Sequence, residues 1–301
     1  MVGAVGHIPV LLGEVLEWLA IRPDGTYLDA TVGLGGHAAE IARRLGSGRL
    51  IGIDRDEAAL AIARERLAGF GERVELVHGT LSSIGEIARR LNIKADGVLA
   101  DLGVSSLQLD TLERGFSFRG AGPLDMRMDQ SAPALAGSTA EEIVNRWPEH
   151  DLADLLFRFG EERDSRKIAR GIVRSRPIRD TQHLATVVAG VLKRGRQRLH
   201  PATKTFLALR IAVNRELEEL EQFLDQAPAT LNPGGRAVVL SYHSLEDRAV
   251  KQAFRRAEHA GVLRVLTKKV IRPGAAECAA NPRARSAKMR VAEKMAVDGA
   301  A

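Results

Sequence analysis

Three aspartates stand at points in about the first third of the chain where a carboxylate could act on a bound ligand. Asp29 comes shortly before the glycine-rich run GLGGHA at 33–38, and Asp54 and Asp101 each end a later apolar run. Glycines let the backbone approach a ligand closely, and the first amide groups of a following helix attract negative charge. The pattern is typical of a site that holds a nucleotide-sized cofactor.

Two kinds of cofactor fit the glycine run. Taken alone, GLGGHA satisfies the dinucleotide pattern G-x-G-x-x-A, and Asp54, about 20 residues on, could accept ribose hydroxyls; this predicts an NAD-dependent hydride-transfer enzyme. Asp29 fits NAD poorly, because a carboxylate there would repel the pyrophosphate in a cleft of low dielectric constant. S-adenosylmethionine carries a sulfonium and an ammonium, which acidic groups complement. Asp29 therefore favours S-adenosylmethionine, and a structural turn without a ligand stays an alternative.

Asp101 follows the apolar residues 98–100 within the run DGVLADLG at 96–103 and is expected to end a strand. It could cap the turn that follows, because Asp commonly does so. It could also border both the transferable methyl group and the incoming nucleophile. In that case we expect Asp101 to orient an exocyclic amine toward the methyl group, since position does more of this work than base strength.

The elements that must position these aspartates alternate along the chain. Apolar, strand-like runs at 26–30, 49–54, 74–79 and 96–103 alternate with helical patterns at 9–19, 37–45, 56–67 and 83–91. Such alternation predicts a Rossmann-like α/β fold with a mostly parallel, doubly wound sheet. Ligands of such sheets bind at the carboxyl ends of the strands, where the three aspartates would meet.

The pattern changes after Ser105. A segment rich in Gly, Pro and Met at 113–129 has no clear period, and helical patterns then open with a capping box at Ser138 and Glu141. A later stripe predicts one long amphipathic helix with Phe206, Leu209, Val213, Leu217, Leu220 and Leu224 on one face.

Two further strands, after the turn at 233–235 and at 288–295, are expected to return the chain to the sheet. We predict a discontinuous cofactor-binding domain of residues 1–106 and 203–301, and an inserted helical substrate-recognition domain of residues 107–202.

Composition points to a globular protein with a polyanionic partner. The 301 residues are 45% hydrophobic, and the net charge of +6 concentrates in basic clusters at 163–179, 193–200 and 263–290. Aromatic residues make up only 4%, which argues against broad base-stacking platforms.

The lone Cys278 excludes an internal disulfide and a multi-cysteine zinc site, and no group of residues has metal-ligand spacing, so no metal is expected. Neither a membrane-length apolar run nor a signal-peptide pattern is visible, so we expect a cytoplasmic protein without a membrane partner.

Several longer motifs are more specific than the glycine run. In chain order they are HIPVLLGEVLEWLAIRPDGTYLDATVGLGGH, IDRDEAAL, DLGVSSLQLDTLERGFSFRGAGPLDMRMD, HPATKTFLALRIAVNRELEELE, GGRAVVLSYHSLEDRAVK and NPRARSAKMRVAE. Over nearly its whole length the chain resembles the bacterial ribosomal RNA small-subunit methyltransferase H family, also called MraW. The motifs GFSFRGAGPLDMRMD and SYHSLEDR carry most of this resemblance.

The resemblance implies a class I methyltransferase that uses S-adenosylmethionine to methylate N4 of a cytidine in the decoding region of small-subunit (16S) ribosomal RNA. It places cofactor contacts on Gly35, Gly36, His37, Asp54, Leu81, Asp101 and Gln108. Leu81 stands where relatives have a phenylalanine, so it could cover adenine but would not stack on it.

Substrate contacts are expected on the basic tail, where Arg283, Arg285, Lys288 and Arg290 would meet phosphates. The segment 113–129, with Phe116 and Phe118, is either a lid or stacking surface or an ordinary buried loop anchor.

His243 either faces the cytosine or packs, and Ser244 is expected to cap the helix that follows. The sequence leaves open a homodimer, and naked RNA or an assembled subunit as substrate. A rival is a basic RNA-binding assembly factor without catalysis, although such a protein would not need the whole constellation of aspartates and glycines.

Overall fold

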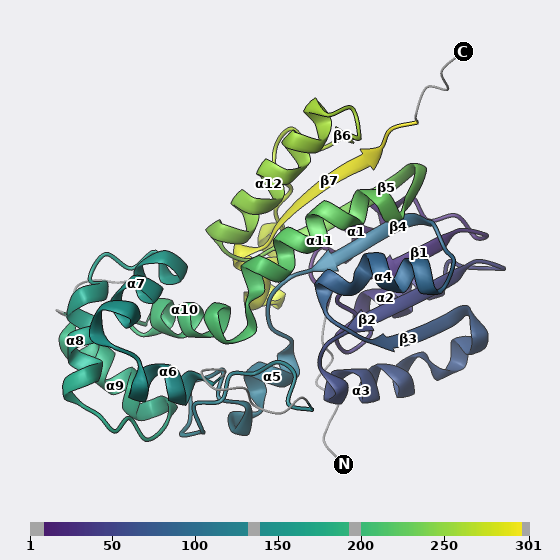
Figure 1. Cartoon of the computed structure of the whole chain (residues 1–301). Coiled ribbons are helices and arrows are strands. Elements are labelled where there is room, and N and C mark those ends of the chain that lie inside the picture. The colour runs from purple at the N-terminus through teal and green to yellow at the C-terminus, as the bar shows by residue number, and fades with distance from the viewer. Residues whose placement is uncertain (1–8, 132–138, 193–199, 297–301) are drawn as a thin grey trace. The chain divides into compact units, whose positions relative to one another are not determined.

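The computed structural model describes residues 9–131, 139–192 and 200–296. The chain forms two compact units, which Figure 1 shows with their elements labelled. The first unit comprises Met1–Gly103 and Leu217–Ala301, and the second comprises Val104–Glu216. Among the described residues, no helix combines the length and the apolar character that a bilayer crossing requires.

The first unit is built on one seven-stranded sheet in the order β3-β2-β1-β4-β5-β7-β6. Its strands are β1 (Thr26–Asp29), β2 (Arg49–Asp54), β3 (Val74–His78), β4 (Ala95–Asp101), β5 (Leu231–Ser241), β6 (Leu263–Val265) and β7 (Lys288–Lys294). β7 runs antiparallel to both of its neighbours, and the other strands are parallel to one another. The predicted mostly parallel, doubly wound sheet is thus confirmed. The antiparallel β7 distinguishes it from the dinucleotide-binding order 3-2-1-4-5-6.

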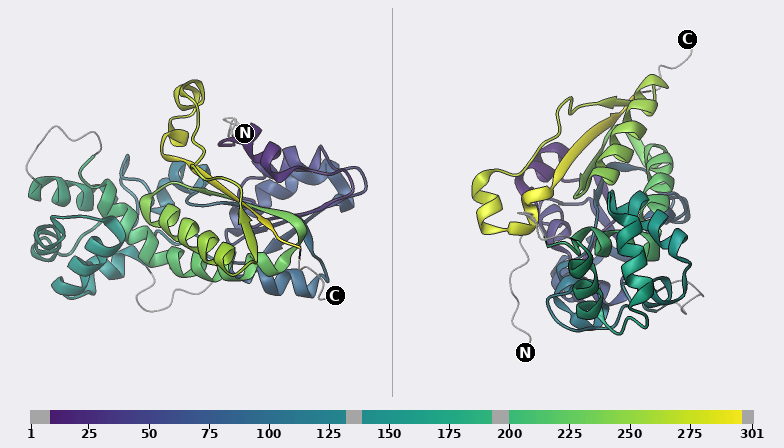
Figure 2. Two further views of the ribbon diagram at one scale, coloured as in Figure 1. Left: turned by 90° about the horizontal axis from the view of Figure 1, so that it is seen from above. Right: turned by 90° about the vertical axis from the view of Figure 1, so that its left-hand side faces the viewer.

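Helices cover both faces of this sheet (Figure 2). They are α1 (Leu12–Leu19), α2 (Gly36–Ala42), α3 (Glu57–Leu67), α4 (Ile84–Arg90), α11 (Glu216–Thr230) and α12 (Ser244–His259). The short α13 (Ala275–Ala280) has no buried residue and is not part of these layers. The 3₁₀ turns η1 (Ala68–Arg73), η2 (Leu81–Ser83) and η4 (Pro282–Ser286) complete the unit.

Successive strand residues point to opposite faces. Leu28 therefore joins the core beneath α4, α11 and α12, whereas Tyr27 joins the core beneath α1, α2 and α3.

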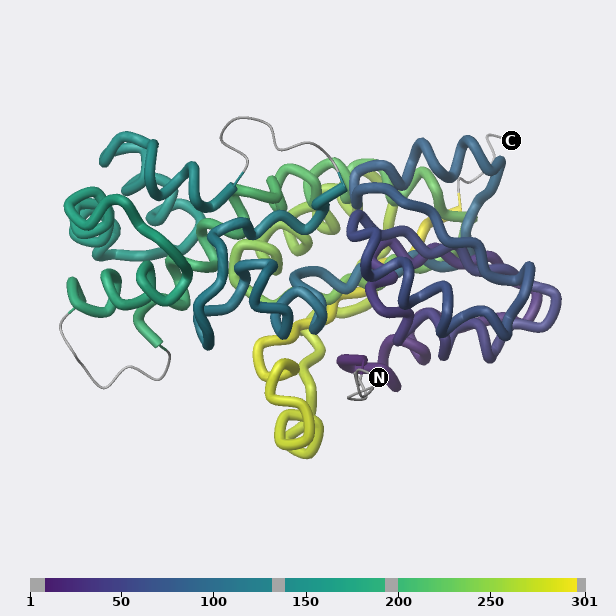
Figure 3. The backbone as a smooth tube through the Cα atoms, turned by 90° about the horizontal axis from the view of Figure 1, so that it is seen from below, coloured from purple at the N-terminus to yellow at the C-terminus, as the bar shows by residue number. Residues whose placement is uncertain are grey.

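Segments from the two ends of the first unit lie side by side. The Leu11 N–H, just before α1, donates a hydrogen bond of 2.7 Å to Oε1 of Glu277 in α13. Figure 3 shows the corresponding purple and yellow segments next to each other. The N-terminal helix is thereby tied to the basic C-terminal region.

The second unit is helical. Its elements are α5 (Ser106–Asp110), η3 (Leu112–Arg114), α6 (Ala140–Arg146), α7 (Glu149–Gly160), α8 (Ser165–Arg174), α9 (Thr181–Val191) and α10 (Thr203–Asn214). Its apolar core includes Leu152, Leu156, Ile168, Ile172, Leu184 and Leu209, each 0% exposed.

The Gly-, Pro- and Met-rich segment belongs to this core. Phe116, Met126 and Met128 are buried within it. The buried Arg114 guanidinium donates to the carbonyls of Arg127 and Met128, at 3.1 and 2.7 Å. Of the two alternatives for 113–129, the structure supports the buried anchor.

The predicted long amphipathic helix does not exist. Arg215 adopts a left-handed conformation with φ of 51°, which ends α10, and α11 starts immediately afterwards. The stripe divides between two cores: Leu209 packs in the helical core, whereas Leu220 packs under the sheet. Because α10 packs against α7, it lies in the second unit, which extends to Glu216 rather than to residue 202.

The predicted cap at Ser138 lies outside the described residues. The N-cap of α6 is Thr139, whose hydroxyl oxygen accepts a hydrogen bond of 3.2 Å from the Glu142 N–H. The cap is therefore one residue later than the sequence pattern indicated.

The division of the stripe can be tested with two substitutions. We expect Leu209→Ala and Leu220→Ala each to cost about 2–5 kcal/mol, because each leaves a cavity in a packed core. Amide hydrogen exchange should show lost protection mainly in α7 and α10 for the first variant and in the sheet for the second. Leu112→Ala, at a side chain 36% exposed, is the control with a smaller effect. Loss of protection in the same segments for both variants would contradict two separate cores.

Candidate functional site

The three aspartates end neighbouring strands of the first unit. Asp29 ends β1, Asp54 ends β2 and Asp101 ends β4. β1 pairs in parallel with both β2 and β4, so the three carboxylates gather at one edge of the sheet. Asp29 is only 1% exposed, whereas Asp54 and Asp101 are half-buried. This is the edge at which ligands of open α/β sheets bind.

The glycine run connects β1 to α2 and is fixed by the second strand. Gly33 and Gly35 have φ of 52° and 77°, a left-handed conformation that favours glycine. The Gly33 N–H donates to Oδ2 of Asp54 at 2.7 Å, and the Asp56 N–H donates to its Oδ1 at 2.9 Å. Asp54 therefore holds the loop in place through both oxygens of its carboxylate.

Burial makes two of these carboxylates costly to ionise. Burial raises the pKa of Asp29 to about 7; the Thr31 N–H, which donates a hydrogen bond to it, opposes the rise. The negative charges of Asp101 and Asp54 contribute to the same rise. Burial likewise raises the pKa of Asp54 to about 6, against the two backbone hydrogen bonds that it accepts. A positively charged ligand at this edge would relieve that cost.

Asp101 is held from two sides. The Tyr242 hydroxyl donates a hydrogen bond of 2.6 Å to Oδ1 of Asp101, and the Asp101 N–H donates to Oγ1 of Thr31 at 2.6 Å. Nδ1 of His37 lies 3.6 Å from Oδ2 of Asp101. His37 is 5% exposed, and its Nε2 lies 3.0 Å from the Val10 carbonyl oxygen. Because that oxygen only accepts hydrogen bonds, Nε2 carries a proton.

Tyr242 is a site residue that the sequence reasoning missed. It follows the last residue of β5, whose Leu240 is in register with Asp101 of β4. Burial, followed by the negative charge of Asp101, raises the pKa of Tyr242 well above its ordinary value, so the phenol remains a donor. The available signal was its place as the first residue beyond the neighbouring strand.

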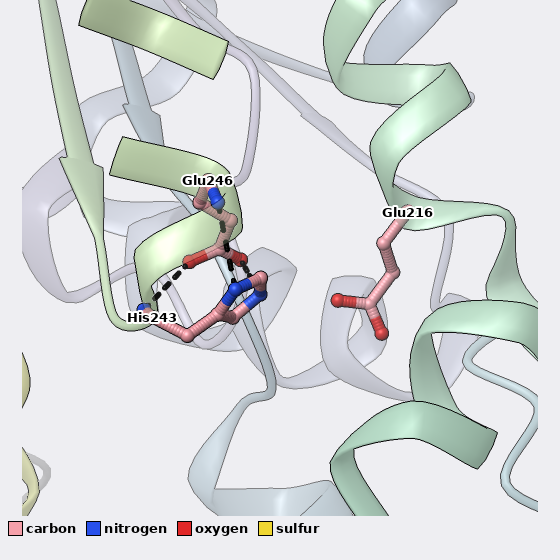
Figure 4. A group of neighbouring side chains, drawn as sticks. All are labelled: Glu216, His243 and Glu246. Atoms are coloured by element: carbon pink, nitrogen blue, oxygen red, sulfur yellow. Dashed lines mark hydrogen bonds and ion pairs between the residues drawn. The ribbon is translucent and has the colours of Figure 1, made fainter. Parts of the chain in front are cut away.

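His243 is the N-cap of α12. Its Nδ1 accepts a hydrogen bond of 3.4 Å from the Glu246 N–H (Figure 4). Oε2 of Glu246 also accepts a hydrogen bond of 2.7 Å from the Tyr242 N–H. The expected cap at Ser244 is therefore wrong by one residue. Glu216, also drawn in Figure 4, accepts two hydrogen bonds of 2.7 Å from the Arg210 guanidinium. Since Glu246 also holds the backbone of Tyr242, the cap helps to position the phenol that binds Asp101.

The remaining predicted cofactor residues lie in different places. Gly36 begins α2 beside the loop, and Leu81 lies half-buried in η2, packed against the sheet core. Gln108 belongs to the second unit, where it is 4% exposed and its Oε1 accepts a hydrogen bond of 3.0 Å from the Ser105 N–H. The first unit thus brings the glycine loop, His37 and the aspartates together.

The predicted RNA-binding residues divide into two pairs. Arg283 and Arg285 are exposed in η4. Lys288 and Arg290 instead contact Asp247 of α12, at 3.1 and 2.7 Å, and their side chains are only 20% and 12% exposed. Burial of Asp247 would raise its pKa, but the hydrogen bonds from Arg290 and Lys288 outweigh this and hold it below its ordinary value. The second pair therefore ties β7 to α12.

The sheet order, the antiparallel β7 and the acidic carboxyl edge fit the class I, S-adenosylmethionine-dependent methyltransferases. Comparison with known proteins is more specific. A model of the MraW methylase family matches residues 4–295, and the chain belongs to this family.

Similar proteins named "Ribosomal RNA small subunit methyltransferase H" occur in several bacteria. That of Koribacter versatilis (strain Ellin345) is 49% identical over 300 residues, covering 96% of this chain and 94% of its own. That of Cyanothece sp. (strain PCC 7425 / ATCC 29141) is 50% identical over 289 residues, covering 96% and 95%. That of Gloeobacter violaceus is 52% identical over 289 residues, covering 96% and 88%.

S-adenosylmethionine is therefore the cofactor, and the residues at the edge fit it. Asp29, Asp54 and Asp101 supply negative charge for a ligand with a sulfonium and an ammonium, whereas a pyrophosphate would raise the cost of their burial further. The NAD-dependent alternative is excluded, because the chain belongs to a methylase family.

The buried charge of Asp29 makes stability depend on pH. Its folded pKa of about 7 exceeds the ordinary value of about 4, so its contribution is fully present below pH 4 and is lost as pH rises toward 7. We expect Asp29→Asn to raise the melting temperature of the ligand-free protein by about 2 °C or more at pH 8, and by much less at pH 4.5.

The same variant should bind S-adenosylmethionine more weakly in equilibrium dialysis at pH 8. Asp24→Asn, at an exposed position, is the matched control. Equal shifts in melting temperature at both pH values would show that the buried charge is not the cause.

The hydrogen bond between Tyr242 and Asp101 predicts energetic coupling. We expect Tyr242→Phe to weaken S-adenosylmethionine binding about 3- to 10-fold, the equivalent of one ordinary hydrogen bond. In an Asp101→Ala background the same change should have little effect, because the acceptor is gone. Dissociation constants for the four proteins of this double-mutant cycle provide the measurement. Additive effects would rule out the coupling, and an unchanged melting temperature of Tyr242→Phe would exclude a folding defect.

Proposed function

We propose that this chain methylates N4 of a cytidine in the decoding region of small-subunit (16S) ribosomal RNA. The observation that carries the proposal is the Asp101 carboxylate, fixed at the cofactor edge by the Tyr242 hydroxyl at 2.6 Å. The names of the relatives support small-subunit ribosomal RNA as the substrate. The choice of N4 and of the decoding region rests on the resemblance in sequence motifs.

In the proposed reaction, the cytosine N4 forms a bond to the methyl carbon as the bond from that carbon to sulfur breaks. S-adenosylmethionine supplies the methyl group and the driving force, because its sulfonium becomes a neutral thioether. Asp101 accepts a hydrogen bond from the exocyclic amine and so orients it. As positive charge develops on N4, the Asp101 carboxylate stabilises it until the methylated amine releases one proton to water.

The other predicted residues take their roles from this reaction. His37, Asp54, Leu81 and Gln108, with Gly35 and Gly36, contact the cofactor, and Asp29 supplies negative charge nearby. The cytidine leaves its base stack to expose N4, and the helical second unit recognises the surrounding RNA. Arg283 and Arg285 contact phosphates, which adds affinity without selecting the base. The reaction takes place in the cytoplasm.

The proposal is tested by mass spectrometry of ribosomal RNA nucleosides from cells with and without this gene. We expect N4-methylcytidine in small-subunit RNA to disappear on deletion and to return with the wild-type gene. A gene that carries Asp101→Ala should restore at least about tenfold less N4-methylcytidine than the wild-type gene. A gene that carries Asp24→Asn, at an exposed position, is the control and should restore the wild-type amount. Unchanged N4-methylcytidine after deletion would refute the proposal.

Purified protein with labelled S-adenosylmethionine extends the test. Naked small-subunit RNA and assembled subunits are offered in parallel, and nuclease mapping of the label identifies the nucleotide. Specific RNA binding without any label transfer would favour the rival assembly factor. Label on a different atom or in a different RNA would replace the proposed target.

A further inference from the structure

We propose that a row of three arginines on α8, Arg166, Arg170 and Arg174, binds the phosphate backbone of the RNA substrate. The identity of that RNA rests on the proposed function. The row itself is argued from the second unit alone, and binding can be measured without catalysis.

The packing of α8 fixes which side chains face solvent. Ser165, Ile168, Ala169 and Ile172 are buried. A Cβ added at Gly171 would lie 2.4 Å from Cγ2 of Val191, so α8 lies against α9 with no room for rotation. The arginines of the row are all exposed. Residues four apart in a helix lie on one face, so the row extends about 12 Å along the face opposite the buried one.

Most of the positive charge of this row is not neutralised. Within the described part of the chain, neither Arg166 nor Arg174 forms an ion pair. Arg170 lies 3.5 Å from Glu149, with side chains 58% and 44% exposed, so that pair is screened by water. Residues 163–179 hold seven basic side chains and one acidic one, a net charge of +6 that equals that of the whole chain.

Not every arginine of the cluster is available. Arg176 donates hydrogen bonds of 2.7 and 2.6 Å to the carbonyl oxygens of Val144 and Trp147. It ties the segment after α8 to α6 and to the residue that follows α6. The structure thus separates an arginine that holds the fold from the three that form the row.

Arginine chemistry and the buried face of α8 favour a nucleic acid over a membrane. A guanidinium matches a phosphate with two parallel hydrogen bonds, and a row with a regular repeat can follow a chain of phosphates. An amphipathic membrane helix must instead insert its apolar face into lipid. On α8 that face, with Ile168 and Ile172, is already buried in the core of the second unit.

The test compares two variants that lose equal charge. Arg166→Gln/Arg174→Gln removes the two unpaired members of the row, and glutamine keeps a similar helix propensity. The control, Arg146→Gln/Arg158→Gln, removes two exposed arginines of α6 and α7. Affinity for an in vitro transcript of the small-subunit RNA is measured by filter binding from 50 to 300 mM KCl. Circular dichroism and S-adenosylmethionine dialysis check that each variant is folded.

We expect the row variant to bind RNA at least about tenfold more weakly near 150 mM salt. Its slope of log affinity against log salt should be shallower by about 1.4–1.8, because two phosphate contacts are lost. The control should change affinity less than about twofold. Equal slopes in the two variants would overturn the inference.

Vesicles of phosphatidylserine and phosphatidylcholine provide a further comparison. If the wild type bound them as tightly as the transcript and the row variant lost both activities, the row would be a lipid-binding surface, and the inference would be overturned. Methyl transfer to the transcript is followed in parallel. Assembled small subunits are offered as well; if the row proves necessary for binding but neither substrate receives a methyl group, the proposed function fails and the inference stands.

Discussion

The site depends on the cost of holding carboxylates at a buried edge of the sheet. A parallel sheet brings the carboxyl ends of β1, β2 and β4 together, and each of these strands ends in aspartate. The packing of the sheet between two helical layers offsets this cost, because the free energy gained by hydrophobic burial exceeds the free energy lost at a few buried carboxylates. The binding of a cation recovers part of it. The carboxylates that destabilise the free protein therefore increase its affinity for a positively charged methyl donor and help to orient that donor.

The local patterns predicted the first half of the sheet well. β2 occupies the predicted residues 49–54, and Asp29, Asp54 and Asp101 lie at the predicted edge. These features depend on short-range signals: β-branched runs, glycine turns and an amphipathic helix between strands. The helix break at Arg215 carries no such signal, because neither glycine nor proline marks it and the apolar stripe continues through it. Only the presence of two separate cores decides where α10 ends.

Contacts between distant residues explain the remaining differences. Tyr242 lies 141 residues from Asp101, and the pairing of Lys288 and Arg290 with Asp247 spans more than 40. A basic cluster in the sequence looks the same whether its members reach solvent or neutralise a buried acid. The sequence of the basic cluster at 163–179 likewise does not distinguish Arg176, which hydrogen-bonds to backbone carbonyl oxygens, from its exposed neighbours. The composition predicts the sign of the surface charge, and only the packing shows which side chains supply it.

The position of β7 affects the order in which the sheet can be completed during synthesis. Among the strands that the structure describes, β6 pairs with β7 alone, and β7 joins it to β5, yet β7 is made after both. Until residues 288–294 leave the ribosome, β5 presents an unpaired edge, and β6 has no place in the sheet. The nascent protein can therefore assemble its cofactor edge early, whereas its final two strands must dock together as a hairpin-like pair. A chain that still lacked β7 would thus carry its three aspartates at one edge of the sheet while the side of β5 remained unpaired.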